Sequence, residues 1–239
     1  MIRRGILNIA NACLRPFKLR LQRTTQATRE RMSDGLQHLI EKGCQPNTCI
    51  DVGSAHGTPD LYAAFPKAKH LLIEPLAEYA PEINKILNKY DCYYVQAAAG
   101  SMPGTLKINV KERITGSSAF SEQPGIPQGT PREVPVVTLD LVCRERNLSG
   151  PYLIKIDVEG AEMEVIRGAK NIMSETLAFI LELTFVARLV RAPEAGEVIR
   201  FMADRDFVLY DIFDLRLREN HALFQANAIF VPHNSRLRT

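Results

Sequence analysis

The chain has 239 residues, of which 46% are hydrophobic and 24% are charged, and this composition is ordinary for a soluble globular protein. The length suits one large α/β domain or two small ones, and such a chain can bury a core without a metal or a disulfide. Its five cysteines form no C-x-x-C pair, which argues against a disulfide framework or a structural zinc site and favours a reducing, cytoplasmic setting. The sequence has no run of about 18 apolar residues that could span a membrane.

The net charge of +3 is unevenly distributed along the chain. Residues 1–31 carry eight of the 30 basic side chains and one of the 27 acidic ones, so the remaining 22 basic and 26 acidic side chains give the rest a charge of −4. We therefore predict a basic N-terminal extension over residues 1–32 and one domain over residues 33–239. Within the extension, Pro16 should end or kink a helix, but apolar residues recur at helical spacing, namely Ile2, Ile6, Ile9, Cys13 and Phe17.

A basic segment with an apolar stripe can lie on an anionic membrane surface. The extension could therefore hold a cytoplasmic protein at the inner surface of the cell membrane. Alternatively, it is a helical extension packed on its own domain, with its arginines in solvent.

The next segments alternate between helix and strand. A first helix is predicted over 33–43, with Ser33 or Asp34 as its cap and Gly43 as its stop. Three strands follow with helices between them. In chain order we predict a strand over 48–52, a helix from Thr58-Pro59 to about 65, a strand over 70–73, a helix to about 88 and a strand over 92–96.

Residues 100–137 interrupt this alternation. Apolar and polar residues alternate over 105–110, which predicts a half-buried strand. Residues 114–132 are rich in Gly, Ser, Pro and Gln and predict a long loop. A returning strand is predicted over 133–137. Long loops inside compact domains are usually functional or disordered. We expect the 114–132 loop to roof a substrate pocket.

The alternation then resumes towards the end of the chain. Predicted elements are a strand over 152–156, a helix over 161–173, a strand over 178–183, a helix over 194–204, and two final strands over 208–213 and 223–231. Strands that alternate with helices predict a doubly wound α/β fold with a mostly parallel sheet. The last two strands, joined by a short polar loop, should form an antiparallel pair at one edge.

The most informative segment is residues 49–57, an apolar strand that ends in Asp51 and is followed by Gly53 and Gly57. Glycines at this turn let the backbone approach a ligand, and ligands of open α/β sheets bind beyond the carboxyl ends of the strands. Neither the dinucleotide motif G-x-G-x-x-G nor a phosphate loop ending in G-K-[ST] is present. The acid before the glycines suits a ligand with a positive amino group, although a plain strand–turn–helix is the alternative.

A second acid, Glu74, ends the next predicted strand, 23 residues after Asp51. An acid in this place can accept hydrogen bonds from both hydroxyls of a ribose, although strand ends also carry solvated acids. A nucleoside with an amino-acid tail and no diphosphate describes S-adenosylmethionine.

Residues 153–162, LIKIDVEGAE, place acids at the end of another apolar strand. Helix capping explains Glu162, because acids favour helix N-termini. Helix capping explains Asp157 less well, because Asp157 ends a strand that is predicted to be central in the sheet. We expect Asp157 to face the crevice at the carboxyl edge of the sheet.

Taken together, these segments resemble the FkbM family of methyltransferases over about residues 46–232. The resemblance rests on 50–57, on Ile73-Glu74-Pro75, on Val137-Thr138-Leu139-Asp140, on 155–162 as its most specific part, on Arg167-Gly168-Ala169 and on Ile229-Phe230-Val231. It implies a seven-stranded sheet of the class I, Rossmann-like methyltransferase type. The chain departs from similar sequences at His56, where many have a small or amide residue, and at Asn227, where an aspartate is expected.

The resemblance also implies an S-adenosylmethionine site. Asp51, Gly53 and Gly57 would hold the methionine end of the cofactor and Glu74 the ribose. The full set of candidate cofactor-binding residues is Asp51, Gly53, Ser54, Gly57, Glu74, Pro75, Ala97 and Asp157.

Further candidates concern the acceptor. His56 could be a general base, although a turn histidine more often caps or packs. Ser117, Ser118, Glu159 and Glu182 are candidate substrate contacts, and the two serines could equally be ordinary loop residues. Asp157 and Glu182, at neighbouring strand ends, could hold a divalent cation, or they could be two hydrogen-bonded acids.

We therefore predict methyl transfer from S-adenosylmethionine to a hydroxyl of a sugar, glycan or natural product, with Asp157 as the first choice of catalytic base. A small-molecule or glycan acceptor is the expected partner, and no nucleic acid is. The alternative is a non-catalytic module that binds a nucleoside and is recruited to a membrane or a protein by its basic extension.

Overall fold

The computed structural model describes residues 9–17, 29–112, 114–186 and 189–239. In the N-terminal extension, residues 9–14 are helical and a 3₁₀ turn, η1 (Arg15–Phe17), follows, so the regular helix ends before Pro16, as predicted. The apolar positions predicted at residues 2 and 6 lie outside the described residues. Among the helices of the described residues, none combines the length and the apolarity needed to cross a membrane.

A seven-stranded sheet forms the centre of the molecule, with strand order β3-β2-β1-β7-β8-β10-β9. All pairings from β3 to β8 are parallel, while β10 is antiparallel to both β8 and β9. The predicted doubly wound, mostly parallel sheet with an antiparallel edge is thus confirmed. The strands are β1 (Thr48–Val52), β2 (Lys69–Ile73), β3 (Cys92–Val95), β7 (Tyr152–Ile156), β8 (Thr176–Thr184), β9 (Phe207–Leu217) and β10 (Leu223–Pro232).

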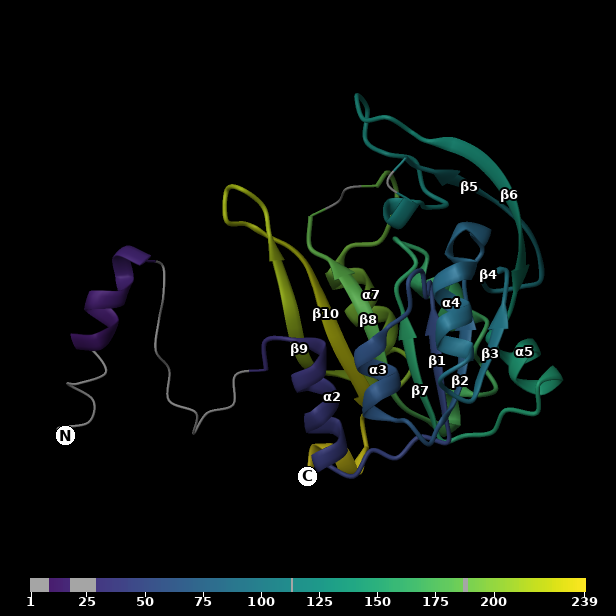
Figure 1. The fold of residues 1–239 in the computed structure, drawn as a ribbon, viewed down its shortest axis with the longest axis horizontal. Coiled ribbons are helices and arrows are strands. Elements are labelled where there is room, and N and C mark those ends of the chain that lie inside the picture. The colour runs from purple at the N-terminus through teal and green to yellow at the C-terminus, as the bar shows by residue number, and fades with distance from the viewer. Residues whose placement is uncertain (1–8, 18–28, 113, 187–188) are drawn as a thin grey trace.

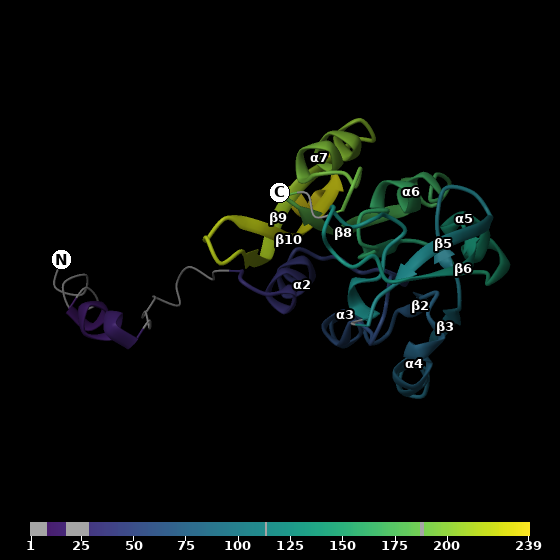
Figure 2. The same ribbon diagram turned by 90° about the horizontal axis from the view of Figure 1, so that it is seen from above.

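Helices cover both faces of this sheet (Figures 1 and 2). One face carries α2 (Met32–Glu41), α3 (Pro59–Ala64) and α4 (Ala80–Leu87), and the other carries α5 (Leu139–Glu145), α6 (Glu162–Arg167) and α7 (Ala195–Ala203). Two apolar clusters result, one on each face of the sheet. Because both faces are covered, β1 and β7 are buried along their whole length.

A second, three-stranded sheet with the order β4-β6-β5 arches over the carboxyl ends of the parallel strands (Figure 1). It contains β4 (Ala98–Ala99), β5 (Gly104–Val110) and β6 (Thr130–Val137), with a 3₁₀ turn, η3 (Ile114–Gly116), between β5 and β6. The predicted loop over 114–132 is therefore shorter than expected, because β6 begins at Thr130 and pairs with Val110 at the end of β5.

Helix ends differ in detail from the prediction. α2 begins at Met32, so Ser33 and Asp34 are not its cap; Asp34 instead lies in the first turn and accepts hydrogen bonds from the amides of Glu30 and Arg31. Gly43, with a φ of +85°, follows the helix end as expected. α6 ends at Arg167, six residues before its predicted end, and α5 was not predicted.

The packed body starts before the predicted boundary at residue 33. Arg29 forms an ion pair with Asp211 on β9, and the amide of Asp214 donates to the carbonyl of Glu30. Met32 belongs to the core. Residues 29–32 are thus part of the domain and not of the extension, because they pack along its edge strand.

Candidate functional site

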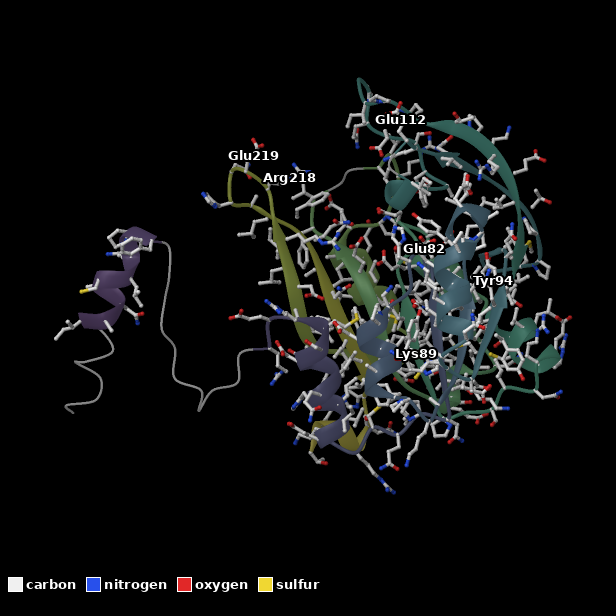
Figure 3. The ribbon with its side chains drawn as sticks, viewed as in Figure 1. Glu82, Lys89, Tyr94, Glu112, Arg218 and Glu219 are labelled. Atoms are coloured by element: carbon white, nitrogen blue, oxygen red, sulfur yellow. The ribbon has the colours of Figure 1, made fainter. Side chains whose placement is uncertain are left out.

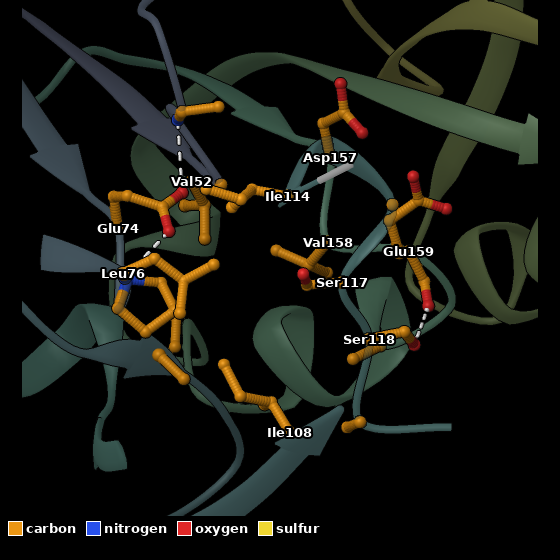
Figure 4. A pocket seen from close by; sticks show the side chains of 18 of the residues that line it. Val52, Glu74, Leu76, Ile108, Ile114, Ser117, Ser118, Asp157, Val158 and Glu159 are labelled. Carbon is orange, nitrogen blue, oxygen red and sulfur yellow. Dashed lines mark hydrogen bonds between the residues drawn. The ribbon is translucent and has the colours of Figure 1, made fainter. Parts of the chain in front are cut away.

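A cavity of about 810 Å³ opens at the carboxyl ends of β1, β2 and β7, beneath the arch of β5 and β6. Its size suits a small organic ligand, since such pockets usually measure 300–1,000 Å³. Figure 4 shows Glu74 on one side of the cavity and Asp157 and Glu159 on the other. The topology explains the location, because parallel strands end together at this edge.

The glycine turn after β1 lets two strand ends approach each other. Gly53 has a φ of +71°, and a Cβ at this position would overlap with the backbone carbonyl oxygen of Asp157. Gly57, with a φ of +88°, would place a Cβ against Ile86. Both positions therefore require glycine, and Gly53 keeps the turns after β1 and β7 in contact.

Behind the cavity wall, Lys155 joins two carboxylates. Its Nζ lies 3.4 Å from Oδ1 of Asp51 and 3.4 Å from Oδ2 of Asp157. Asp51 also accepts a hydrogen bond from the Tyr62 hydroxyl. Burial alone would lower the pKa of Lys155, but the two carboxylates raise it above its ordinary value. Lys155 is therefore a permanent cation that fixes both acids.

Glu74 is buried at the end of β2 and is held by the backbone. Its Oε2 accepts from the amide of Ala55 at 3.1 Å, and its Oε1 accepts from the amide of Leu76 at 2.9 Å. Burial raises the pKa of Glu74 to about 7, although these two hydrogen bonds oppose the shift. Each carboxylate oxygen has a second lone pair, so Glu74 can still accept hydrogen bonds from a ligand.

Within the part of the chain that the structure describes, two buried polar atoms near the glycine turn have no hydrogen-bond partner, namely the hydroxyl of Tyr79 and Oγ of Ser54. Tyr79 lines the cavity close to Glu74 and is 4% exposed. Buried polar groups are normally paired, so an orphan hydroxyl in a cavity wall is what a site built for a polar ligand would show. His56 packs edge-on against the Tyr79 ring at 4.8 Å between centroids and is exposed.

At the other end of the cavity, Asp157, Glu159 and Glu182 lie in the wall. Glu182 is 8% exposed, and its carboxylate contacts Gln225 and Arg216 from the β9–β10 hairpin. Burial and the charges of Asp157 and Glu159 raise the pKa of Glu182 to about 8, while Arg216 opposes this shift. This end of the cavity is therefore acidic, and the negative charges of its carboxylates repel one another.

Ser117 and Ser118, in the segment between β5 and β6, also have defined hydrogen-bond partners. Oγ of Ser118 donates to the carbonyl oxygen of Glu159 at 2.7 Å, as Figure 4 shows, and accepts from the amide of Phe120. Oγ of Ser117 accepts from the amide of Lys111. Ser118 thus connects the segment between β5 and β6 to the turn at Glu159, whose φ is +52°.

A family model, described as the methyltransferase FkbM domain, matches residues 51–209. The chain belongs to the FkbM methyltransferase family. The match begins at Asp51 and includes the glycine turn, the roof and the acids at both ends of the cavity. Among curated proteins, no match was found.

Solved structures also resemble this FkbM domain at low identity. An N1-methyltransferase of 1,6-didemethyltoxoflavin from Burkholderia thailandensis is 11% identical with a TM-score of 0.44, over 84% of this chain and 76% of that one. A putative rRNA methylase from Clostridium thermocellum is 9% identical with a TM-score of 0.47, over 88% and 99%. A putative S-adenosylmethionine-dependent methyltransferase from Listeria monocytogenes is 10% identical with a TM-score of 0.46, over 84% and 99%. These values concern the backbone arrangement and not the chemistry.

Most of the predicted site residues of the FkbM domain meet at one cavity. Nine of them lie in its wall, namely Gly53, Glu74, Pro75, Ala97, Ser117, Ser118, Asp157, Glu159 and Glu182. Asp51, Ser54, His56 and Gly57 are not in the wall. Asp51 and Ser54 are buried, and Asp51 is paired with Lys155; contact between Asp51 and a ligand stays a prediction.

Other wall residues were not predicted, among them Tyr79, Arg216, Phe224 and Gln225. Tyr79 follows Glu74 closely in sequence, and an aromatic residue shortly after the strand-end acid was an available signal. The other three lie on the last two strands, and nothing in their local pattern distinguishes them from ordinary strand residues.

No group of three or more His, Cys, Asp or Glu side chains is arranged to hold a metal ion in the part of the chain that the structure describes. Asp157 and Glu182 both line the cavity, and both contact protein side chains: Asp157 contacts Lys155, and Glu182 contacts Gln225 and Arg216.

Proposed function

We propose that this FkbM domain binds S-adenosylmethionine in the cavity and methylates a hydroxyl oxygen of a sugar, glycan or natural product. The observation that carries the proposal is the cavity itself, which has a buried acid and an orphan tyrosine hydroxyl at one end and three acids at the other. A nucleoside cofactor fits the first end. A polyhydroxylated acceptor, rich in hydrogen-bond donors, fits the second.

The residues at the cofactor end suit S-adenosylmethionine. Glu74 offers carboxylate lone pairs to ribose hydroxyls, and the hydroxyl of Tyr79 has no hydrogen-bond partner among the described residues. Gly53 lets the turn after β1 lie against the carbonyl oxygen of Asp157, with which a Cβ would overlap. Asp157, at the acidic end beside Lys155, offers a negative charge to the amino group of a cofactor that extends from Glu74 across the cavity.

When bound, S-adenosylmethionine supplies a methyl group that its positively charged sulfur already activates. The chain's residues then have three tasks. The walls align the acceptor with the cofactor, the arch of β5 and β6 limits the access of water, and a carboxylate at the acidic end takes up the hydroxyl proton. His56 lies outside the wall in this structure, so we assign it none of these tasks.

The test begins with the product cofactor. Isothermal calorimetry and thermal denaturation with and without S-adenosylhomocysteine should show specific binding and stabilisation, and adenosine diphosphate should bind far more weakly. Methyl glycosides and phenolic natural products, incubated with S-adenosylmethionine, should then gain the mass of one CH2 group, the net change when a methyl group replaces a hydroxyl hydrogen. Saturable binding of S-adenosylhomocysteine without methyl transfer to the oxygen of any acceptor would instead support a nucleoside-binding module. Absence of S-adenosylhomocysteine binding would contradict both functions.

A further inference from the structure

The acidic end of the cavity contains two carboxylates on neighbouring strands whose surroundings differ. Asp157 follows β7 and its side chain is 34% exposed. Its Oδ2 faces Nζ of Lys155, a buried ammonium that is shared with Asp51. The charge of Asp157 is therefore committed to an ion pair within the protein.

Glu182, in contrast, belongs to β8 and lies almost wholly inside the wall. Nε2 of Gln225 donates to its Oε2 at 2.7 Å, and a guanidinium nitrogen of Arg216 lies 3.1 Å from its Oε1. The two partners come from adjacent strands, β10 and β9, and hold the carboxylate from two directions. Glu182 is thus fixed in orientation while it still faces the cavity.

The charges around Glu182 favour proton uptake. Besides burial, the carboxylates of Asp157, Glu159 and Glu162 raise its pKa, and Arg216 opposes this shift. A general base works best when its pKa lies near the working pH. Asp157 is paired with a buried ammonium, whereas Glu182 lies among acids and its cation, Arg216, has a side chain that is 62% exposed. Such different surroundings of two carboxylates in one site separate their acid–base roles.

We propose that Glu182 is the proton acceptor of the methyl transfer, that Arg216 and Gln225 are its positioning residues, and that Asp157 acts on the cofactor side together with Lys155. This rests on the proposed O-methylation. The acceptor oxygen forms a bond to the methyl carbon, the methyl–sulfur bond breaks with its electron pair staying on sulfur, and the hydroxyl proton passes to a carboxylate oxygen of Glu182. Solvent takes up that proton after the product leaves.

Glu182→Gln tests the role, because it keeps the size of the side chain and removes its basicity. General bases contribute about 100-fold or more to the rate, so turnover should fall by at least that factor, while the affinity for S-adenosylhomocysteine stays within about twofold. Asp157→Asn should show the opposite pattern, with the larger loss in cofactor affinity. Glu219→Gln, at the exposed tip of the same hairpin (Figure 3), is the matched control and should change neither quantity.

The pH profile distinguishes a base from a structural residue. Turnover should rise with pH through the pKa of Glu182, and Arg216→Met should move the inflection to higher pH, because it removes the cation that favours the charged form. Retention of more than about a tenth of the turnover in Glu182→Gln, against the expected loss, would overturn the proposal. An unchanged inflection in Arg216→Met would also do so.

The pKa of Glu182 can be measured without an acceptor, so this measurement does not depend on the proposed function. In ¹³C NMR of glutamate-labelled protein with S-adenosylhomocysteine, the carboxyl signal that Glu182→Gln removes should titrate well above 4.5, the ordinary value. Titration of that signal near 4.5 would overturn the assignment of Glu182. A signal near 4.5 in a protein that methylates a hydroxyl would overturn the role of Glu182 and leave the proposed function standing. If the signal titrates high but the protein methylates no hydroxyl, the proposed function fails, and the role of Glu182 in methyl transfer fails with it.

Discussion

Nζ of Lys155 lies 3.4 Å from Oδ1 of Asp51, and the two residues are direct neighbours on β7 and β1. Both side chains are buried. The pair therefore ties the two central strands together immediately below the cavity. Asp51 depends on Lys155 for the neutralisation of its charge, while Lys155 also pairs with Asp157.

Lys155→Met should destabilise the domain strongly, because it leaves Asp51 as a buried charge without its cation. Breaking such a pair costs about 3–5 kcal/mol, which urea denaturation can measure. Lys107→Met, at an exposed position on β5, is the control and should cost little. The double variant Asp51→Asn with Lys155→Met should recover part of the loss, and failure to recover any would argue against the pair as the cause.

Glu74→Ala should weaken the binding of S-adenosylhomocysteine about tenfold or more, because hydrogen bonds to charged groups are worth about 1.5–3 kcal/mol each. Calorimetry gives the dissociation constant directly. Glu78→Ala removes an acid in the following turn that pairs with Arg132 at the surface, and it should leave the affinity unchanged. Equal affinities in both variants would remove Glu74 from the cofactor site.

Gly53→Ala should impair folding and cofactor binding together. A methyl group at Gly53 would overlap with the carbonyl oxygen of Asp157, and the φ of +71° disfavours any side chain. Gly104→Ala, with open space around its Cα, is the matched control. We expect a lower melting temperature for Gly53→Ala alone, and equal melting temperatures would show that the turn tolerates a side chain.

Stability should fall as pH rises from about 5 to 8. Burial raises the pKa of Glu162 to about 7, against 4.5 for the ordinary group. The folded state thus holds a proton that the unfolded state has already lost in this range, and stability decreases with pH wherever the folded state binds more protons. In Glu162→Gln, which stays neutral, the decline measured by denaturation at several pH values should be shallower. A parallel decline in both proteins would assign the effect to other groups.

We also propose that the basic extension brings the protein to anionic membranes. Full-length protein should sediment with phosphatidylserine vesicles, and less so in high salt, but not with phosphatidylcholine vesicles. The truncated variant should start at Arg29, because Arg29 and Glu30 contact β9 and belong to the folded domain. It should stay in the supernatant while retaining the melting temperature of the full chain. Binding that survives truncation would place the membrane contact elsewhere.

The sequence predicted those parts of the fold whose signals are local. Each strand of the parallel sheet is a short apolar run, and strand-end acids such as Asp157 and Glu182 mark the edge where ligands bind. The helix α5 was not predicted, because its apolar residues span only two turns. Lys155 was visible as a lone cation in an apolar strand, but its two partners became apparent only when the strands were paired.

The contribution of Arg216 and Gln225 could not be predicted, for a different reason. Both lie on strands that are remote from the glycine turn in sequence, and the order β8-β10-β9 decides that they reach Glu182. Register shifts on β10 flank Gln225, and irregularities of this kind redirect a side chain without any clear mark in the sequence.

The order of the last three strands has a consequence for synthesis of the protein. β10 follows β9 in the chain but lies between β8 and β9. Until β10 inserts, β8 and β9 each expose an unpaired edge of backbone donors and acceptors, and such edges invite pairing with other chains. The nascent chain is therefore most prone to aggregate after β9 has been made and before β10 is in place, and a chaperone that shields strand edges would help most in that interval.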